Sequence, residues 1–208
     1  MGREFIGLPV RVDPRYLQSQ LGQDRFLIFA LDHKIGGRFL DIGAGEPWYL
    51  SNTLAIEKAL GWRGVLCDIA YQSEHMRLRD SDVTGDAFGV NWPGTCKSFA
   101  IDGRIDFLSL DLEPPALTER LLNLLPLDSI RFSIMCIEHD GYRNDDGEYG
   151  DGTDRRDRMR SLLRSHGYEL FANVGCNGEL FDDWWIDPQV IDAGDLNRRI
   201  DAALGSTS

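Results

Sequence analysis

The sequence lacks the features that mark membrane and secreted proteins. None of its 208 residues belong to an apolar run near the roughly 18 residues that a membrane-spanning helix needs. The first segment carries Arg3 and Glu4 without a long apolar stretch, which is not the pattern of a secretory signal. Ile6 stands where a myristoylation signal requires Ser or Thr. We therefore expect a cytoplasmic protein without a membrane span.

Cysteine and basic residues are also few. The four cysteines lie far apart, with no C-x-x-C pair and no His at ligand spacing, which argues against a structural zinc site. There are 22 Lys and Arg against 34 Asp and Glu, giving a formal net charge of −12. Because this charge opposes binding to a phosphate backbone, we expect no nucleic-acid partner and a small-molecule substrate. The oligomeric state stays open.

What is present is the composition of a globular domain, with 42% hydrophobic and 27% charged residues. Strand-like apolar runs alternate with helical patterns, which predicts an α/β fold with a mostly parallel central sheet and helices on both faces. We expect a single domain with a helical N-terminal extension at 1–34, a core at 38–187 and a weakly ordered tail at 195–208.

The expected elements follow the apolar periodicity. Strands are predicted at 38–44, 63–70, 104–113 and 129–140, with two closing strands in "ELFANVG" and "DDWWIDP"; helices are predicted at 51–62, 73–81, 115–125 and 155–168. The segment 83–103 is rich in Gly and contains Pro93, so no element is assigned to it.

Acidic residues end four of these strands. Asp41, Asp68 and Asp111 end three of them, and Glu138 ends a fourth. Ligands of an open α/β sheet bind in the crevice beyond the carboxyl ends of the strands. The sequence therefore predicts that these acids converge on one cleft.

The loop after the first strand has two close glycines but no dinucleotide fingerprint. Gly43 and Gly45 allow a close backbone approach, whereas Trp48 stands where the third glycine of G-x-G-x-x-G would lie. A ligand without a pyrophosphate, but with a ribose and a charged amino-acid part, fits this loop better. S-adenosylmethionine is such a ligand, with Asp68 as the acceptor of its ribose hydroxyls.

Longer blocks carry a family resemblance. "SQLGQDRFLIFALDHKIGGRFLDIGA", "SNTLAIEKALGWRGVLCD", "RIDFLSLDLE", "IEHD" and "LLRSHGYELF" followed by "DDWWI" resemble, in order and spacing, the FkbM family of S-adenosylmethionine-dependent methyltransferases. The resemblance extends from about Ser19 to Asp187. It implies a Rossmann-like methyltransferase fold with a seven-stranded sheet. It also implies O-methylation of a hydroxyl on a sugar, lipid or secondary metabolite.

The resemblance also implies site residues. The cofactor-binding residues expected from it and from the loop are Asp41, Gly43, Gly45, Glu46, Ser51, Asp68, Ile69, Asp111 and Glu113. The chain departs from the family pattern at Pro47, which removes an amide donor from the first loop, at Pro114, and at Asp68-Ile69 in place of a glutamate-proline pair. Asp86 is a candidate for the adenine pocket.

Methyl transfer to a hydroxyl also needs a base near the methyl group. His139, Asp111 and Asp140 are the candidates, and we favour His139 because its ordinary pKa suits neutral pH. Asp111 and Glu113 could instead hold a divalent cation, to which an acidic loop with Asp145, Asp146, Glu148 and Asp151 would add oxygens.

Several patterns keep two interpretations. Arg156, Arg160 and Arg164 share a helix face that is either solvated or grips a phosphorylated acceptor, and Trp184-Trp185 and Trp48 either wall the pocket or pack in the core. A non-catalytic domain that binds S-adenosylmethionine is the alternative function, because Pro47 and Pro114 fall inside cofactor motifs. A dinucleotide oxidoreductase is a third hypothesis, which Trp48 disfavours.

Overall fold

A computed structural model of the chain describes residues 5–70, 74, 77–143 and 152–205. The strands are β1 (Arg38–Ile42), β2 (Arg63–Cys67), β3 (Asp82–Thr84), β4 (Arg104–Leu110), β5 (Arg131–Glu138), β6 (Glu169–Cys176) and β7 (Glu179–Ile186). The helices are α1 (Gln23–Ala30), α2 (Leu54–Leu60), α4 (Trp92–Phe99), α5 (Ala116–Leu122), α6 (Gly152–Ser165) and α7 (Ala193–Gly205), with 3-10 turns η1 (Pro14–Tyr16) and η2 (Ala87–Gly89).

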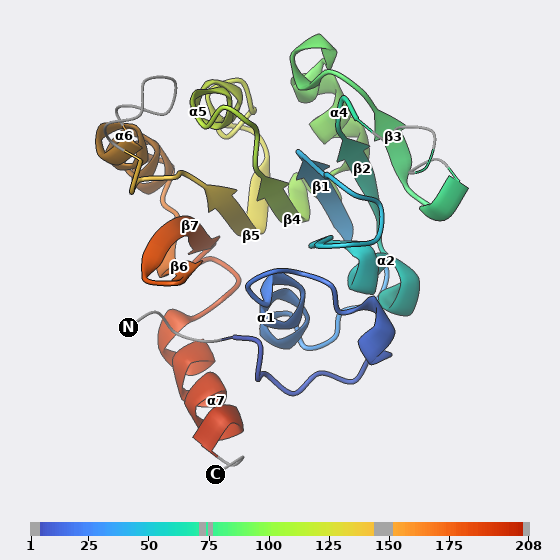
Figure 1. Cartoon of the computed structure of the whole chain (residues 1–208), viewed down its shortest axis with the longest axis vertical. Coiled ribbons are helices and arrows are strands. Elements are labelled where there is room, and N and C mark those ends of the chain that lie inside the picture. The colour runs from blue at the N-terminus through green and yellow to red at the C-terminus, as the bar shows by residue number, and fades with distance from the viewer. Residues whose placement is uncertain (1–4, 71–73, 75–76, 144–151, 206–208) are drawn as a thin grey trace.

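The strands form one seven-stranded sheet in the order β3-β2-β1-β4-β5-β7-β6 (Figure 1). β1, β2, β3, β4 and β5 pair in parallel, and β7 is antiparallel to both β5 and β6. β1 pairs with β2 on one side and with β4 on the other, so the chain reverses its direction of winding between β1 and β4. The predicted mixed α/β fold with a mostly parallel sheet is confirmed.

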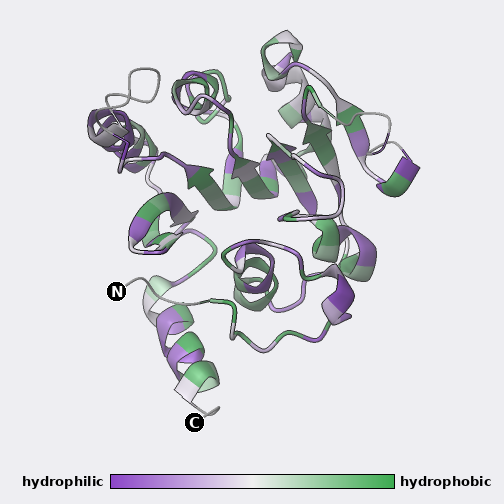
Figure 2. Cartoon of the chain, viewed as in Figure 1, coloured by the Kyte–Doolittle hydropathy of each residue, from purple (hydrophilic) through white to green (hydrophobic). Residues whose placement is uncertain are grey.

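Helices cover both faces of the sheet because side chains of successive strand residues point to opposite faces. In β1, Phe39 packs into a core with α1, α2 and α7, whereas Leu40 packs into a second core with α4, α5 and α6. Figure 1 shows the two helical layers on either side of the strands, and Figure 2 shows the hydrophobic strand residues between them. The expected helices on both faces are therefore present.

The segment that the sequence left unassigned, 83–103, contains the end of β3, η2 and α4. Pro93 lies in the first turn of α4, where its missing amide proton costs no hydrogen bond, and the side chain of Asn91 caps the helix. Trp92 is buried and donates its indole N–H to the carbonyl of Ala87 at 2.8 Å. The helix expected at 73–81 lies partly outside the described residues.

Segments at both ends of the chain pack on the same face. Phe5 contacts Phe26 of α1 and Trp184 of β7, with ring centroids 5.3 and 4.5 Å apart. α7 buries Leu196 and Ile200 against the same core. The division of the chain into extension, core and tail stays a prediction. In the part of the chain that the structure describes, no helix is both long and apolar enough to cross a bilayer.

Candidate functional site

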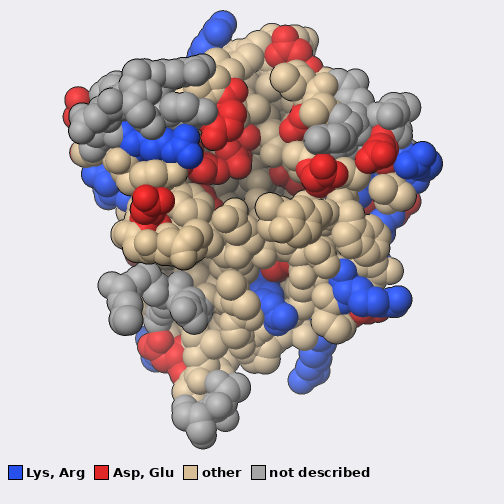
Figure 3. All heavy atoms as spheres, viewed as in Figure 1, with Lys and Arg blue, Asp and Glu red and all other residues tan. Residues whose placement is uncertain are grey.

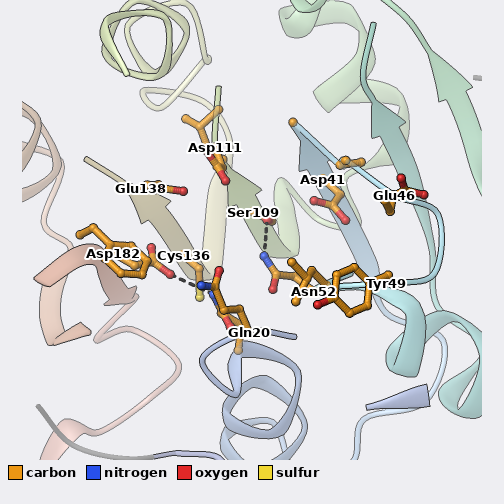
Figure 4. A pocket seen from close by; sticks show the side chains of 17 residues that line it. Gln20, Asp41, Glu46, Tyr49, Asn52, Ser109, Asp111, Cys136, Glu138 and Asp182 are labelled. Atoms are coloured by element: carbon orange, nitrogen blue, oxygen red, sulfur yellow. Dashed lines mark hydrogen bonds between the residues drawn. The ribbon is translucent and has the colours of Figure 1, made fainter. Parts of the chain in front are cut away.

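Two cavities meet where the winding of the sheet reverses, which is where an open α/β sheet binds ligands. The first, of about 300 Å³, is lined by residues that include Gln20, Gln23, Asp41, Gly45, Glu46, Tyr49, Asn52, Ser109, Cys136, Glu138, Phe181 and Asp182 (Figure 4). The second, of about 350 Å³, is lined by Asp68, Ile69, Asp86, Ala87, Phe88, Glu113 and Leu117 among others. Gly43 and Asp111 line both. Both volumes are within the range of small-molecule sites.

Strand alternation places the two cavities on opposite faces of the sheet. Asp41, Ser109, Cys136 and Asp182 stand on the face covered by α1, so the first cavity reaches between the sheet and that helix. The second lies on the side of Cys67, Ala87 and α5. Figure 3 shows acidic side chains gathered around a hollow over the region where β4 and β5 end.

The first loop passes closely over the end of β4. Gly43 has a φ of +82°, and a Cβ on it would lie 1.5 Å from the carbonyl oxygen of Asp111. Its amide donates to the carbonyl of Cys67 at 2.8 Å, which ties the loop to the end of β2. Only glycine fits this point. A Cβ on Gly45, by contrast, would meet nothing within 4 Å, so the backbone at that residue borders open space in the first cavity.

Asp68 supports the same loop from the end of β2. Its carboxylate accepts hydrogen bonds from the amides of Gly45 at 2.9 Å and Ala70 at 2.7 Å. It lines the second cavity beside Ile69, whose side chain is 80% exposed. The sequence-predicted Asp41, Gly43, Gly45, Glu46, Asp68, Ile69, Asp111 and Glu113 therefore all line one cavity or the other, and so does Asp86.

A buried polar network holds the remainder of the loop. Thr53 donates to Asp41 at 2.5 Å and accepts from Arg79 at 2.9 Å. Arg79 also pairs with Glu57 at 2.7 Å, with neither side chain exposed, and donates to Ser51 at 3.2 Å. Ser51, which was expected to bind the cofactor, is thus buried behind the loop. It is not among the described residues that line either cavity.

Pro47 and Trp48 lie in the same loop and differ in exposure. Pro47 is buried, and its carbonyl accepts from Arg79 at 3.3 Å. Trp48 is 41% exposed and packs against Tyr16 of η1, with centroids 5.8 Å apart. Trp184 and Trp185 lie in the two hydrophobic cores, so the alternative in which they wall the pocket is wrong.

Three carboxyl groups share the wall formed by β4, β5 and β7. A hydrogen bond joins Glu138 to Asp111. Although part of Asp111 faces the cavity, surrounding atoms desolvate its carboxyl and raise its pKa, while the bond from Glu138 opposes that rise. Burial, followed by the bond to Asp111, raises the pKa of Glu138 far above its usual range. Burial thus favours the protonated form of both carboxyl groups, and the hydrogen bond between them lets the pair share a proton.

Asp182 stands directly opposite Glu138 in the β5–β7 pair. Burial raises the pKa of Asp182 to about 7, and the charge of Asp111 contributes to the rise. Sequence reasoning missed Asp182 as a site residue. The pair Asp182-Asp183 at the start of an apolar strand was the available signal, but alternation sends one side chain into the cavity and the other to the opposite face.

His139 occupies a different position from the one expected of a general base. It is fully buried, accepts from the amide of Gly141 at 2.8 Å on Nδ1, and has Nε2 3.4 Å from Asp183 and 3.0 Å from Asn173. Neither His139 nor Asp140 is among the described residues that line the two cavities. Of the three expected bases, Asp111 is the one that lines them, and the role of His139 stays a prediction.

The arginines on one face of α6 contact other residues of this chain. Arg160 pairs with both oxygens of Asp183 at 2.7 Å, Arg164 lies over the ring of Trp185, and Arg156 pairs with Asp157. Across residues 5–70, 74, 77–143 and 152–205, no group of three or more His, Cys, Asp or Glu is placed to hold a metal ion. The expected acidic loop with Asp145, Asp146, Glu148 and Asp151 lies outside the described residues.

Comparisons with known proteins give only distant likenesses. No family model and no curated protein sequence matches the chain. Among solved structures, it is similar to a Methanococcus jannaschii fibrillarin, a pre-rRNA processing protein (14% identity, TM-score 0.49), over 74% of this chain and 67% of that one. The chain is also similar to the N-methyltransferase NodS of Bradyrhizobium japonicum (11% identity, TM-score 0.43), over 80% of this chain and 94% of that one. A third similar structure is Aeropyrum pernix fibrillarin with bound S-adenosyl-L-methionine (15% identity, TM-score 0.40), over 89% of this chain and 88% of that one. Likenesses this low assign neither a family nor a function.

Proposed function

We propose that the chain is an S-adenosylmethionine-dependent methyltransferase of the FkbM type, which methylates a hydroxyl of a small molecule. The observation that carries this proposal is the meeting of two anionic cavities at Gly43 and Asp111, at the switch point of the sheet. No Lys, Arg or His occurs among the described residues that line either cavity.

The second cavity fits an adenosine. Ile69, Ala87, Phe88 and Leu117 supply apolar surface for a flat ring, and Asp68 supplies a carboxylate for hydroxyl donors. Asp68 already accepts two backbone amides, so its position is fixed before a ligand arrives. A ribose and an adenine in this cavity would place the sulfur-bearing end of the cofactor toward Gly43 and Asp111.

Charge distinguishes this cofactor from a dinucleotide. A pyrophosphate needs basic side chains or a helix N-terminus. The first loop instead runs from 43 to 53 before α2 begins, contains Glu46, and lies beside Asp41 and Asp111. The amino group and sulfonium of S-adenosylmethionine are cations, and carboxylates in a cavity that excludes bulk water attract cations strongly. The donor set therefore fits the sulfonium cofactor.

When bound, S-adenosylmethionine supplies a methyl group already activated for transfer. The task of this chain is then to align the acceptor oxygen, exclude water and take the proton of the hydroxyl. We assign the last role to Asp111, because it lies where the two cavities meet and because the raised pKa that burial gives its carboxyl suits it to accept a proton. Gly43 and Gly45 hold the cofactor's methionine part close to the backbone.

Calorimetry tests the cofactor directly. We expect S-adenosylmethionine and S-adenosylhomocysteine to bind and NAD not to bind, and we expect Asp68→Ala to weaken both sulfur ligands by at least about tenfold, since a charged acceptor of two hydroxyls is lost. Asp128→Asn is the control, because Asp128 is almost fully exposed and remote from the cavities. Failure of both sulfur ligands to bind at millimolar concentration would refute the proposal.

Turnover separates an enzyme from the non-catalytic alternative. In a panel of hydroxylated acceptors, formation of S-adenosylhomocysteine should occur with the wild type. At saturating cofactor, it should fall by about 100-fold or more in Asp111→Asn, as expected for loss of a general base. His139→Ala provides the comparison: a similar loss of rate there would return the base assignment to His139.

A further inference from the structure

The inner wall of the first cavity contains a carboxyl group that the cofactor residues do not engage. Asp182 is 5% exposed and lines the cavity beside Cys136 and Phe181. Its Oδ2 accepts from Gln23 Nε2 at 3.2 Å and from Trp184 Nε1 at 2.9 Å. Its Oδ1 is buried and has no hydrogen-bond partner among the residues that the structure describes. A buried acceptor left in this state costs free energy, so it points to a donor that arrives with a ligand.

Among the described residues that line the first cavity, the neighbours of Asp182 include two more carboxyl groups and no cationic side chain. Glu138 lies opposite Asp182 across the β5–β7 pair, and Asp111 directly follows the next strand, β4. The guanidinium of Arg160, on α6, is held by both oxygens of Asp183, whose side chain points to the other face of the sheet. Because the described side chains also form no metal-holding group, an organic cation is what this wall fits.

This wall is distinct from the one that would meet the cofactor's own amino group. Figure 4 shows Asp182 and Glu138 on the side of β5 and β7, with Asp41, Glu46 and Tyr49 across the cavity on the side of β1 and its loop. The methionine part of a cofactor that lies on Gly43 and Gly45 faces the second group. Asp182 is left for the acceptor.

We propose that Asp182 Oδ1 binds the protonated amine of the acceptor, so that the natural substrate is a hydroxylated amine such as an amino sugar or an amino alcohol. This inference rests on the proposed methyltransferase function for its direction, and it narrows the acceptor class. Gln23 and Trp184 orient the carboxyl group through Oδ2, which leaves Oδ1 as the oxygen that still needs a donor. Phosphorylated and carboxylated acceptors are repelled by the same wall.

Matched ligands test the proposal. Glucosamine, N-acetylglucosamine and glucose form one set, and ethanolamine, N-acetylethanolamine and ethylene glycol form another. Each is titrated by NMR or thermal shift with and without saturating S-adenosylhomocysteine. We expect the amine of at least one set to bind about tenfold more tightly than both of its neutral partners, since a charge-assisted hydrogen bond exceeds a neutral one. Equal affinity for amine, amide and diol in both sets would overturn the proposal.

Asp182→Asn assigns the preference to this residue. Asn keeps an oxygen for Gln23 and Trp184 while removing the charge, so the amine preference should fall below about twofold with cofactor affinity retained. Glu179→Gln, an exposed change at the start of the same strand, should leave the preference unchanged. Retention of the full preference in Asp182→Asn would refute the assignment. If that variant does not fold, the wild-type comparison of amine with amide still decides.

The two proposals fail in different ways. Binding of S-adenosylmethionine with no preference for an amine overturns the acceptor class alone. The protein could instead bind neither sulfur ligand and still prefer an amine through Asp182. That result would support the cation site and refute the methyltransferase function.

Discussion

At the scale of single residues, Gly43 is the most constrained position of the site. Its Cα lies so close to β4 that a Cβ would meet the carbonyl oxygen of Asp111 at 1.5 Å, and the obstacle is backbone rather than a flexible side chain. Its φ of +82° adds a conformational penalty for any other residue. The loop and the end of β4 can therefore meet here only through glycine.

We expect Gly43→Ala to lower the free energy of unfolding by about 3 kcal/mol or more, because the backbone must shift, and to abolish cofactor binding. Gly45→Ala is the matched control, since its φ is also positive at +57° but its Cβ would enter open space. It should cost about 1 kcal/mol. Urea unfolding and calorimetry of the two variants provide the measurement, and equal costs would contradict the steric explanation.

Residue identity alone predicted part of the site. Asp41, Asp68 and Asp111 could be brought together from the sequence, because parallel strands end at one edge of the sheet. The directions in which side chains point could not be predicted from the sequence. Ser51 turns inward to Arg79, and His139 turns into the protein, because the partners that hold them lie far away in sequence. The actual roles of these residues stay predictions.

At the scale of elements, the first loop depends on a buried ion pair beneath it. Arg79 and Glu57 are both fully buried and connect the segment after β2 to α2 and to the loop through Ser51, Thr53 and Pro47. Breaking a buried pair leaves the other charge without a partner, which is costly.

Arg79→Met should therefore destabilise the protein by about 3 to 5 kcal/mol and weaken cofactor binding, since the loop loses its support. Arg198→Gln is the control, because Arg198 and Asp195 form an exposed pair on α7 whose loss should cost below about 1 kcal/mol. Thermal or urea unfolding compares the two. A small cost for Arg79→Met would mean that the loop is held mainly by its backbone.

The prediction of helices and strands succeeded where the apolar periodicity was regular. It failed where Pro and Gly residues could mark either a break or the start of a helix. The strands at β4 and β5 could be predicted as apolar runs, and the final hairpin of β6 and β7 from two such runs. Helix α4 could not, because Pro93 in a glycine-rich segment indicates a break equally well as a first turn. Asp182 and Asp183 show the same limit, since the register that decides which one faces the cavity is set by β5.

At the scale of the whole molecule, two neighbouring carboxyl groups give stability opposite dependences on pH. Burial raises the pKa of Asp182 to about 7. The stability that this neutral group contributes is complete below its unfolded pKa near 4 and is lost as pH rises through 7. Burial opposes ionisation of Asp183 as well, but hydrogen bonds from Arg160 and His139 hold its pKa to about 2. Its contribution is present above pH 4 and is lost as pH falls through 2.

We therefore expect the unfolding free energy of the wild type to fall between pH 4 and pH 8 relative to that of Asp182→Asn, by on the order of 4 kcal/mol for a shift of this size. Urea unfolding across this pH range provides the measurement. Parallel pH profiles of the two proteins would show that Asp182 ionises in its native environment at an ordinary pKa.

The contact of two cavities at a single glycine and a single aspartate has a practical consequence for inhibition. If the two cavities bind adenosine and an amine as we propose, a bisubstrate compound with these two ends would need only a short tether across Gly43. Occupying one half would raise the effective concentration at the other, so two weak fragments would give a tight blocker without any new contact.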